Sequence, residues 1–325
     1  MTRKILTVSI AAYNVEKYIA DCLDSFGEDA FEKIEVIIVN DGSTDGTLEI
    51  ARDYELRRPQ TFKVVDKPNG GYGSTINAAL REATGKYFRF LDGDDWMNTE
   101  ILEQYLELLE DSDEEAVYTP YVRIYEDGGD ADLKDDLAAF GEGVYPESAF
   151  LNMPIIAACS LTYKTSMLRE IDFKMTERCF YTDVEFACIP FVHVKTMRVS
   201  KLPLYRYRIG RTGQSVSISG IERHYKDLIR VCERLLQESK KEENTGSEYF
   251  QRYIVTQCTL VYSFLTRIRP SAERKASLKQ FDGLLKCHQP VYEATARNSK
   301  KVRILRGSAF IAYRPLCRIL SGRHN

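Results

Sequence analysis

Long hydrophobic runs are missing from this chain of 325 residues. No segment approaches the roughly 18 continuous apolar residues from which a membrane-spanning helix is inferred. An excess of one charge is missing too, because 45 Lys and Arg side chains nearly balance 48 Asp and Glu side chains and leave a net charge of −3. The basic excess of a nucleic-acid-binding domain is therefore absent, and we expect no nucleic-acid partner. The sequence also contains no internal repeat.

Paired cysteines are absent as well. The eight cysteines are scattered without a C-x-x-C pair, and the four histidines lie far apart without metal-ligand spacing. This pattern favours reduced, buried thiols in a cytoplasmic protein over a zinc site or a disulfide scaffold. The basic start at Arg3 and Lys4, followed by the apolar run 5–12, resembles a signal peptide, but the run is short and contains Thr7 and Ser9. We therefore predict a core strand there.

The composition is that of an ordinary globular protein, with 44% hydrophobic and 29% charged residues. Strand and helix patterns alternate at the start of the chain, which predicts an α/β fold with a mostly parallel sheet flanked by helices. The predicted strands are 5–11, 34–40, 62–65 and 86–91, and the predicted helices are 15–26, 45–56 and 74–83. From residue 221 onwards the pattern is helical, which predicts helices at 221–240, 247–268 and 272–287.

Polar clusters follow three of the predicted strands. They are 12–14, 40–43 and the acids Asp92, Asp94 and Asp95. Ligands of such sheets bind outside the carboxyl ends of the strands. Adjacent carboxylates repel one another unless a cation lies among them, and Mg²⁺ usually combines one or two carboxylates with phosphate oxygens. On these residues alone, a metal site and an acidic turn that caps the helix starting near Thr99 are both open.

A glycine-rich segment lies between these clusters. Gly70, Gly71 and Gly73 precede a predicted helix, so the backbone can approach a ligand closely and the helix N-terminus favours an anion. The alternative is a flexible loop that ends at a Ser74 cap. Its place between two polar clusters favours a ligand-binding loop.

Three segments, in this order and spacing, together resemble the family 2 glycosyltransferases. They are Val8–Asn14 with Glu16, Val39–Thr47 and Phe90–Asp95. The resemblance covers the chain up to about residue 100 and implies a GT-A fold and a nucleotide-sugar donor. It implies that the nucleoside pocket is lined by Ala11, Tyr13, Glu16 and Asp41. The family usually has proline where Ala11 stands.

The resemblance also gives the acidic strand end a role. Asp92, Asp94 and Asp95 match the family's motif for metal and diphosphate. It implies Asp94 and Asp95 as ligands of Mn²⁺ or Mg²⁺, and Asp92 as the residue nearer the ribose or sugar of the donor.

Further donor contacts are implied by the resemblance at Gly70, Gly71, Asn77, Arg208 and Arg211. Asn77 matches an asparagine that recurs in the family. The two arginines match phosphate oxygens geometrically, although a solvated basic loop is the alternative.

A second acid cluster lies at 180–186. Inverting glycosyl transfer needs one base to accept the proton of the acceptor hydroxyl, whereas a metal stabilises the departing nucleotide diphosphate. The resemblance implies that Asp183 is this base, with Thr182 where glutamate is common. Glu185 competes for the role, and a simple helix cap at Asp183 is the alternative.

We therefore expect a GT-A glycosyltransferase domain at 1–215, with a nucleotide-sugar-binding half at 1–120 and an acceptor and catalytic-base half at 121–215. A helical C-terminal region is expected at 216–325. The expected reaction is metal-dependent, inverting transfer of one hexosyl unit from a UDP-sugar to a glycan or lipid-linked acceptor in cell-surface polysaccharide biosynthesis. The Gln-x-x-Arg-Trp signature of processive synthases is absent. The alternatives are a nucleotidyltransferase and a non-catalytic nucleotide-sugar-binding or glycan-binding protein.

The C-terminal tail is basic. From Arg297 to the end, the chain contains arginines and lysines interleaved with apolar residues and no acid. Such a tail can lie on an anionic membrane surface, which for a cytoplasmic enzyme is the inner face of the membrane. It can equally pack on an acidic patch of its own protein.

Overall fold

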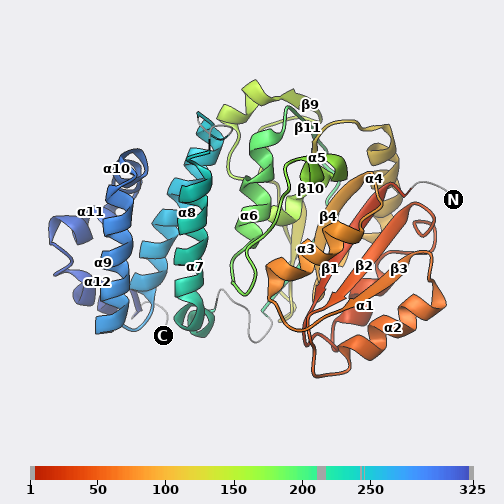
Figure 1. Cartoon of the computed structure of the whole chain (residues 1–325), viewed down its shortest axis with the longest axis horizontal. Helices are drawn as coiled ribbons and strands as arrows, with labels where there is room; N and C mark the ends of the chain where they lie inside the picture. Colours follow the sequence, from red (N-terminus) through yellow and green to blue (C-terminus); the bar gives the residue numbers. More distant parts are fainter. Residues whose placement is uncertain (1–3, 211–216, 242–243, 245, 322–325) are drawn as a thin grey trace. The chain divides into compact units, whose positions relative to one another are not determined.

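The computed structural model describes residues 4–210, 217–241, 244 and 246–321. The chain divides into two compact units, Met1–Arg211 and Thr212–Asn325. Figure 1 shows strands covered by helices in the first unit and helices in the second. The predicted fold class, a mostly parallel sheet flanked by helices and followed by a helical region, is confirmed.

The larger sheet of the first unit has the strand order β3-β2-β1-β4-β10-β6-β11-β9. Within the described residues, β10 and β9 run antiparallel to their neighbours and the other strands share one direction. Its strands are β1 (Leu6–Ala12), β2 (Ile34–Asn40), β3 (Phe62–Asp66), β4 (Tyr87–Asp92), β6 (Ala116–Tyr118), β9 (Gly143–Pro146), β10 (Leu161–Lys164) and β11 (Thr196–Val199).

Helices cover both faces of this sheet, which explains why its central strands are almost entirely apolar. One face belongs to a core that joins Leu6, Val8 and Ile10 of β1 to apolar side chains of α1, α2 and α4. On the other face, α3 packs against β1 and β2. The helices of this unit are α1 (Ile19–Asp24), α2 (Thr47–Arg57), α3 (Tyr72–Glu82), α4 (Thr99–Asp111), α5 (Thr165–Glu170) and α6 (Asp183–Cys188), with short 3₁₀ turns η1 (Glu147–Asn152), η2 (Ala158–Ser160) and η3 (Pro190–His193).

A smaller sheet has the strand order β5-β12-β7-β8. Strand β12 pairs antiparallel with β5 and parallel with β7, and β7 pairs antiparallel with β8. Its strands are β5 (Trp96–Met97), β7 (Tyr121–Tyr125), β8 (Asp132–Lys134) and β12 (Tyr205–Ile209). Because β5 follows β4 after a short turn, this sheet lies next to the acidic strand end.

The register of the large sheet brings the three predicted polar clusters to one edge. Ala11 lies opposite Asp92, and Ala12 lies opposite Asn40. The turn after β4 is tight, since the Gly93 amide donates to the Ala11 carbonyl at 3.2 Å. A Cβ at Gly93 would lie 2.9 Å from that oxygen, so only glycine fits there.

The second unit is built from α7 (Ile218–Glu238), α8 (Glu248–Arg267), α9 (Ala272–Lys286), α10 (Gln289–Asn298), α11 (Lys300–Gly307) and α12 (Tyr313–Ser321). Four of these helices begin after a serine whose hydroxyl accepts a backbone amide of the first turn, namely Ser217, Ser247, Ser271 and Ser299. Among the helices of the described ranges, none has the length and apolar character to cross a membrane.

Candidate active site

The acidic loop after β4 is fixed to β12 through Asp95. This residue is 1% exposed. Its carboxylate accepts the Tyr205 hydroxyl at 2.5 Å and the Arg208 amide at 2.8 Å. Burial, followed by the charges of Asp92 and Asp94, raises the pKa of Asp95 well above its usual range. The structure therefore gives Asp95 the role of holding the loop in place.

Arg208 supports the same loop from outside. Its Nε donates to the Asp94 carbonyl at 2.8 Å, and its guanidinium lies between the rings of Tyr18 and Trp96, 4.9 and 4.7 Å from their centroids. The side chain also approaches Asp21 at 3.2 Å. The sequence predicted Arg208 as a donor contact, and in the structure its contacts hold the acidic loop. Arg211 lies outside the described residues.

Asp92 and Asp94 remain half-buried at the strand end. The negative charge at the strand end affects two neighbouring tyrosines. Burial, followed by the charge of Asp92, raises the pKa of both Tyr72 and Tyr207. Among the described residues, no group of three or more His, Cys, Asp or Glu side chains is arranged to hold a metal. A magnesium-type ion that is completed by phosphate oxygens needs only one or two carboxylates, so this concentration of negative charge fits such an ion.

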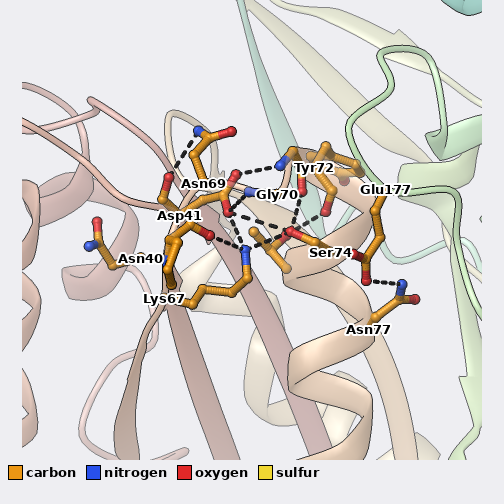
Figure 2. Close-up of polar contacts among 12 residues, drawn as sticks. Asn40, Asp41, Lys67, Asn69, Gly70, Tyr72, Ser74, Asn77 and Glu177 are labelled. Atoms are coloured by element: carbon orange, nitrogen blue, oxygen red, sulfur yellow. Dashed lines mark hydrogen bonds and ion pairs between the residues drawn. The ribbon is translucent and has the colours of Figure 1, made fainter.

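Asp41 organises the loop before α3 (Figure 2). It is 3% exposed, and its carboxylate accepts the amides of Gly70 and Gly71, both at 2.8 Å. The ammonium of Lys67 forms an ion pair with it and also donates to Ser74 at 2.7 Å. The amides that the sequence offered to donor phosphates are thus used by Asp41, which sets the shape of the predicted nucleoside pocket.

The glycines of this loop allow a close approach of residues 175–178, a segment that we call the bridging segment. The Arg178 amide donates to the Gly70 carbonyl at 2.6 Å. A Cβ at Gly73 would lie 2.2 Å from the Thr176 carbonyl oxygen, and Gly71 has a φ of +79°. In this structure the loop glycines therefore serve contact with protein backbone.

Asn77 holds the bridging segment from α3. Its amide group donates to the Met175 carbonyl at 2.9 Å and to Glu177 at 3.1 Å, and its oxygen accepts the Met175 amide at 2.8 Å. Figure 2 shows Asn77 next to Glu177. Since Asn77 is 8% exposed, these contacts give it a structural role beside the predicted donor pocket.

The end of β1 supplies the other predicted pocket residues. Tyr13 is 51% exposed and Ala11 is half-buried. The carboxylate of Glu16 accepts the Gly46 amide at 2.7 Å, which ties the segment after β1 to the start of α2. Of these residues, Tyr13 is the one whose ring is available to a planar ligand.

The two acidic residues of the second acid cluster, Glu185 and Asp183, lie in different environments. Glu185 is fully buried, and its oxygens accept the amide and the hydroxyl of Thr176, each at 2.7 Å. Asp183 begins α6 and is exposed to solvent. Surrounding protein still removes enough water from the Asp183 carboxyl to raise its pKa, against the opposing effect of the amides of Asp183 and Val184. Of the two competitors, Asp183 alone is an exposed residue.

Aromatic packing between α6 and β4 positions Asp183 near the acidic strand end. Phe186, one turn along α6, packs edge-on against Phe90 of β4 with ring centroids 5.0 Å apart. The charges of both Asp92 and Asp183 act on the buried hydroxyl of Tyr72. Asp183 therefore lies on the same side of the sheet as Asp92, although 91 sequence positions separate the two.

Some residues of the site escape sequence reasoning. Tyr72, Tyr205 and Tyr207 surround the acids, and Lys67 pairs with Asp41. The sequence could have indicated Lys67, because it is the one cation between the predicted strand 62–65 and the loop glycines. The tyrosines had no such signal, since aromatic residues within strands, such as Tyr205 and Tyr207, or at the start of a helix, such as Tyr72, are typical of any core.

A family model described as "Glycosyl transferase family 2" matches residues 7–172, which is more than half of the chain. EpsH of Bacillus subtilis (strain 168), provisionally assigned as a glycosyltransferase, is 28% identical over 303 residues, which cover 90% of this chain and 86% of that protein. The chain belongs to glycosyl transferase family 2. This membership decides against the nucleotidyltransferase alternative.

Solved structures share the fold. The Staphylococcus aureus TarS fragment 1–349 in complex with UDP-GlcNAc superposes with a TM-score of 0.67 at 19% identity, over 98% of this chain and 88% of that one. A mannosyltransferase from Pyrobaculum calidifontis, in complex with GDP-Man and Mn²⁺, gives a TM-score of 0.52 at 16% identity, over 99% of this chain and 88% of that one. In sequence, TarS is 27% identical over 65% of this chain, which spans 36% of that protein.

Proposed function

We propose that this chain transfers one hexosyl unit, with inversion, from a UDP-sugar to an acceptor hydroxyl in cell-surface glycan synthesis. The observation that carries the proposal is the meeting, at one sheet edge, of a negatively charged strand end, a loop shaped by Asp41 and the exposed residue Asp183. One relative supports the substrate class, since TarS is a poly(ribitol-phosphate) β-N-acetylglucosaminyltransferase and was solved with UDP-GlcNAc.

Asp94 and Asp92 are the pair that we propose to hold Mn²⁺ or Mg²⁺. The sequence favoured Asp94 with Asp95, but both oxygens of Asp95 accept hydrogen bonds inside the protein. A bound divalent cation would offset the negative charge of the departing nucleotide diphosphate. The mannosyltransferase with the same fold was solved with Mn²⁺.

Asp183 is the proposed base. Its exposure leaves room for an acceptor hydroxyl, and a raised pKa increases its affinity for the proton that it removes. The bridging segment supports this role, because Glu185 holds it from α6 while Asn77 and the loop glycines hold it from the donor side. The base and the predicted donor pocket are thereby connected through a few buried hydrogen bonds.

The C-terminal tail supports a proposed location at the inner membrane face of a cytoplasmic enzyme. One side of the tail packs within its own unit, since Val302, Leu305, Tyr313 and Cys317 are buried. The exposed residues include apolar and basic ones, among them Arg303, Ile304, Ile311, Arg314, Arg318 and Ile319. Cosedimentation with phosphatidylglycerol vesicles tests this contact: binding should exceed that to phosphatidylcholine vesicles, and Ile311→Ser should weaken it.

A binding screen tests the proposed donor. The protein is heated with a panel of nucleotide sugars, with and without Mn²⁺, because a ligand of the folded state raises the apparent melting temperature. We expect the largest rise with a UDP-sugar and Mn²⁺ together, followed by slow release of UDP from that donor. Binding without any UDP release, over a broad panel of acceptors, would instead favour a non-catalytic nucleotide-sugar-binding protein.

A further inference from the structure

One face of the small sheet carries tyrosines and an arginine beside the acidic loop. Strand register pairs Tyr205 with Tyr121 and Tyr207 with Arg123. Because side chains alternate along a strand, these four and Tyr125 share one face, which we call the tyrosine–arginine face. Its Tyr205 end donates to Asp95. The face therefore begins at the acidic loop and extends away from it along β12 and β7.

Tyr207 connects this face to the proposed chemistry. Its ring lies 6.4 Å from that of Tyr121 and 6.5 Å from that of Tyr205. The charges of Asp92 and Asp183 both act on its hydroxyl. Tyr207 is half-buried, so part of its ring still meets solvent. A molecule lying on this face would consequently have one end close to the proposed base.

The Nε of Arg123 is a buried donor that the described protein does not use. Arg123 forms no ion pair with any described acid, and its buried Nε has no hydrogen-bond partner there. The rest of its guanidinium interacts with the Tyr121 and Tyr125 hydroxyls, and its charge also acts on the Asp136 carboxyl. The facing residue Asp132 pairs with Lys134 instead. An unpaired buried donor costs about 1–3 kcal/mol, which a ligand can recover.

Arg123 differs in this respect from other arginines of the same unit. Arg208 donates to the Asp94 carbonyl and approaches Asp21, and Arg198 binds Glu114 with two hydrogen bonds. A planar guanidinium that is not held by an acid matches the oxygens of a phosphate or a carboxylate. Tyrosine rings offer apolar surface with a polar end, as a sugar ligand requires.

We propose that the tyrosine–arginine face binds the acceptor, and that this acceptor is a glycan with a negatively charged group, a phosphate or a carboxylate, which Arg123 contacts. Tyr121 and Tyr205 are buried in the core, so the half-buried ring of Tyr207 is the one that packs against the sugar unit nearest the base. The inference rests on the proposed transferase function. It adds the charge class of the acceptor, by which the enzyme would choose among the glycans that reach Asp183.

Calorimetry with matched probes tests this site. The protein is first saturated with UDP and Mn²⁺, so that the donor pocket is filled before any anion is added. Ribitol 5-phosphate is then compared with ribitol, and methyl β-glucuronide with methyl β-glucoside. We expect at least one charged probe to bind about tenfold more tightly than its neutral partner. Which probe is preferred distinguishes a phosphate-bearing acceptor from a carboxylate-bearing one.

Two variants identify the residue responsible. Arg123→Gln should remove most of the preference for the charged probe. Arg206→Gln is the matched control, because Arg206 lies on the same sheet, pairs with Val122 and belongs to the opposite face. It should keep the preference.

The inference is overturned if neither charged probe is preferred, or if Arg206→Gln loses the preference as fully as Arg123→Gln. Failure of UDP to bind in the first step would instead refute the proposed function, and the inference with it. UDP binding without discrimination by Arg123 refutes the inference alone.

Discussion

The two carboxylates of the second acid cluster should respond differently to neutral substitutions. Glu185 is fully buried and accepts the amide and the hydroxyl of Thr176. In Glu185→Gln, the side-chain oxygen can still accept the amide, and the new amide group can donate to the hydroxyl. Only the charge assistance is lost, so we expect a loss of about 1 kcal/mol in the free energy of unfolding.

Truncation at the same position removes far more. Glu185→Ala leaves the Thr176 amide without its acceptor and opens a cavity beneath the bridging segment. The lost hydrogen bonds and the cavity together predict a loss of about 3–5 kcal/mol. Since single domains are stable by about 5–15 kcal/mol, the variant should still fold.

Urea unfolding and donor turnover, measured on the same preparations, provide the assay. The account predicts that Glu185→Gln keeps turnover within about tenfold of the wild type, because the residue contributes structure and takes no proton. A Glu185→Gln variant with unchanged stability and a turnover lowered by a factor of about a thousand would refute this reasoning and make Glu185 the base.

Three further predictions concern the loop, the acids and pH. Gly73→Ala should destabilise by about 1–3 kcal/mol in urea, because its Cβ meets backbone, whereas Gly283→Ala, with nothing within 4 Å, should be neutral or stabilising. Tyr205→Phe should cost about 1.5–3 kcal/mol in the same assay, since the buried Asp95 carboxylate loses a hydroxyl. Because the pKa of Asp183 is raised, its carboxylate becomes protonated at a higher pH than an ordinary aspartate of pKa about 3.9. We therefore expect kcat/KM to fall on the acid side at that higher pH. A pH–rate profile without this acid limb would contradict the assignment.

The sequence allows the framework of the first unit to be predicted, because buried parallel strands appear as continuous apolar runs. The predicted strand 34–40 coincides with β2 (Ile34–Asn40). Helix 15–26 was predicted too long, since α1 covers Ile19–Asp24 and the Val15 amide donates to Thr47 instead. Strands β8 and β9 were not predicted, because short strands with charged or glycine residues lack a hydrophobic pattern.

The side chains of the site were harder to predict than their positions. The sequence placed Asp95, Asn77 and Arg208 near the ligand, but not the contacts that hold them. Asn77 binds a segment 98 positions away, and Asp95 binds Tyr205 110 positions away. Local periodicity carries no information on partners so distant in sequence, so a polar side chain that holds a loop looks the same as one that binds a donor.

The most direct measurement of the central claim is the turnover of Asp183→Asn with the nucleotide sugar that the binding screen selects. Asparagine can still occupy the start of α6 but cannot take the acceptor proton. The account predicts a fall in kcat of about 10²–10⁴-fold, with donor affinity and unfolding free energy close to those of the wild type. Turnover equal to that of the wild type would contradict Asp183 as the base and with it the proposed mechanism.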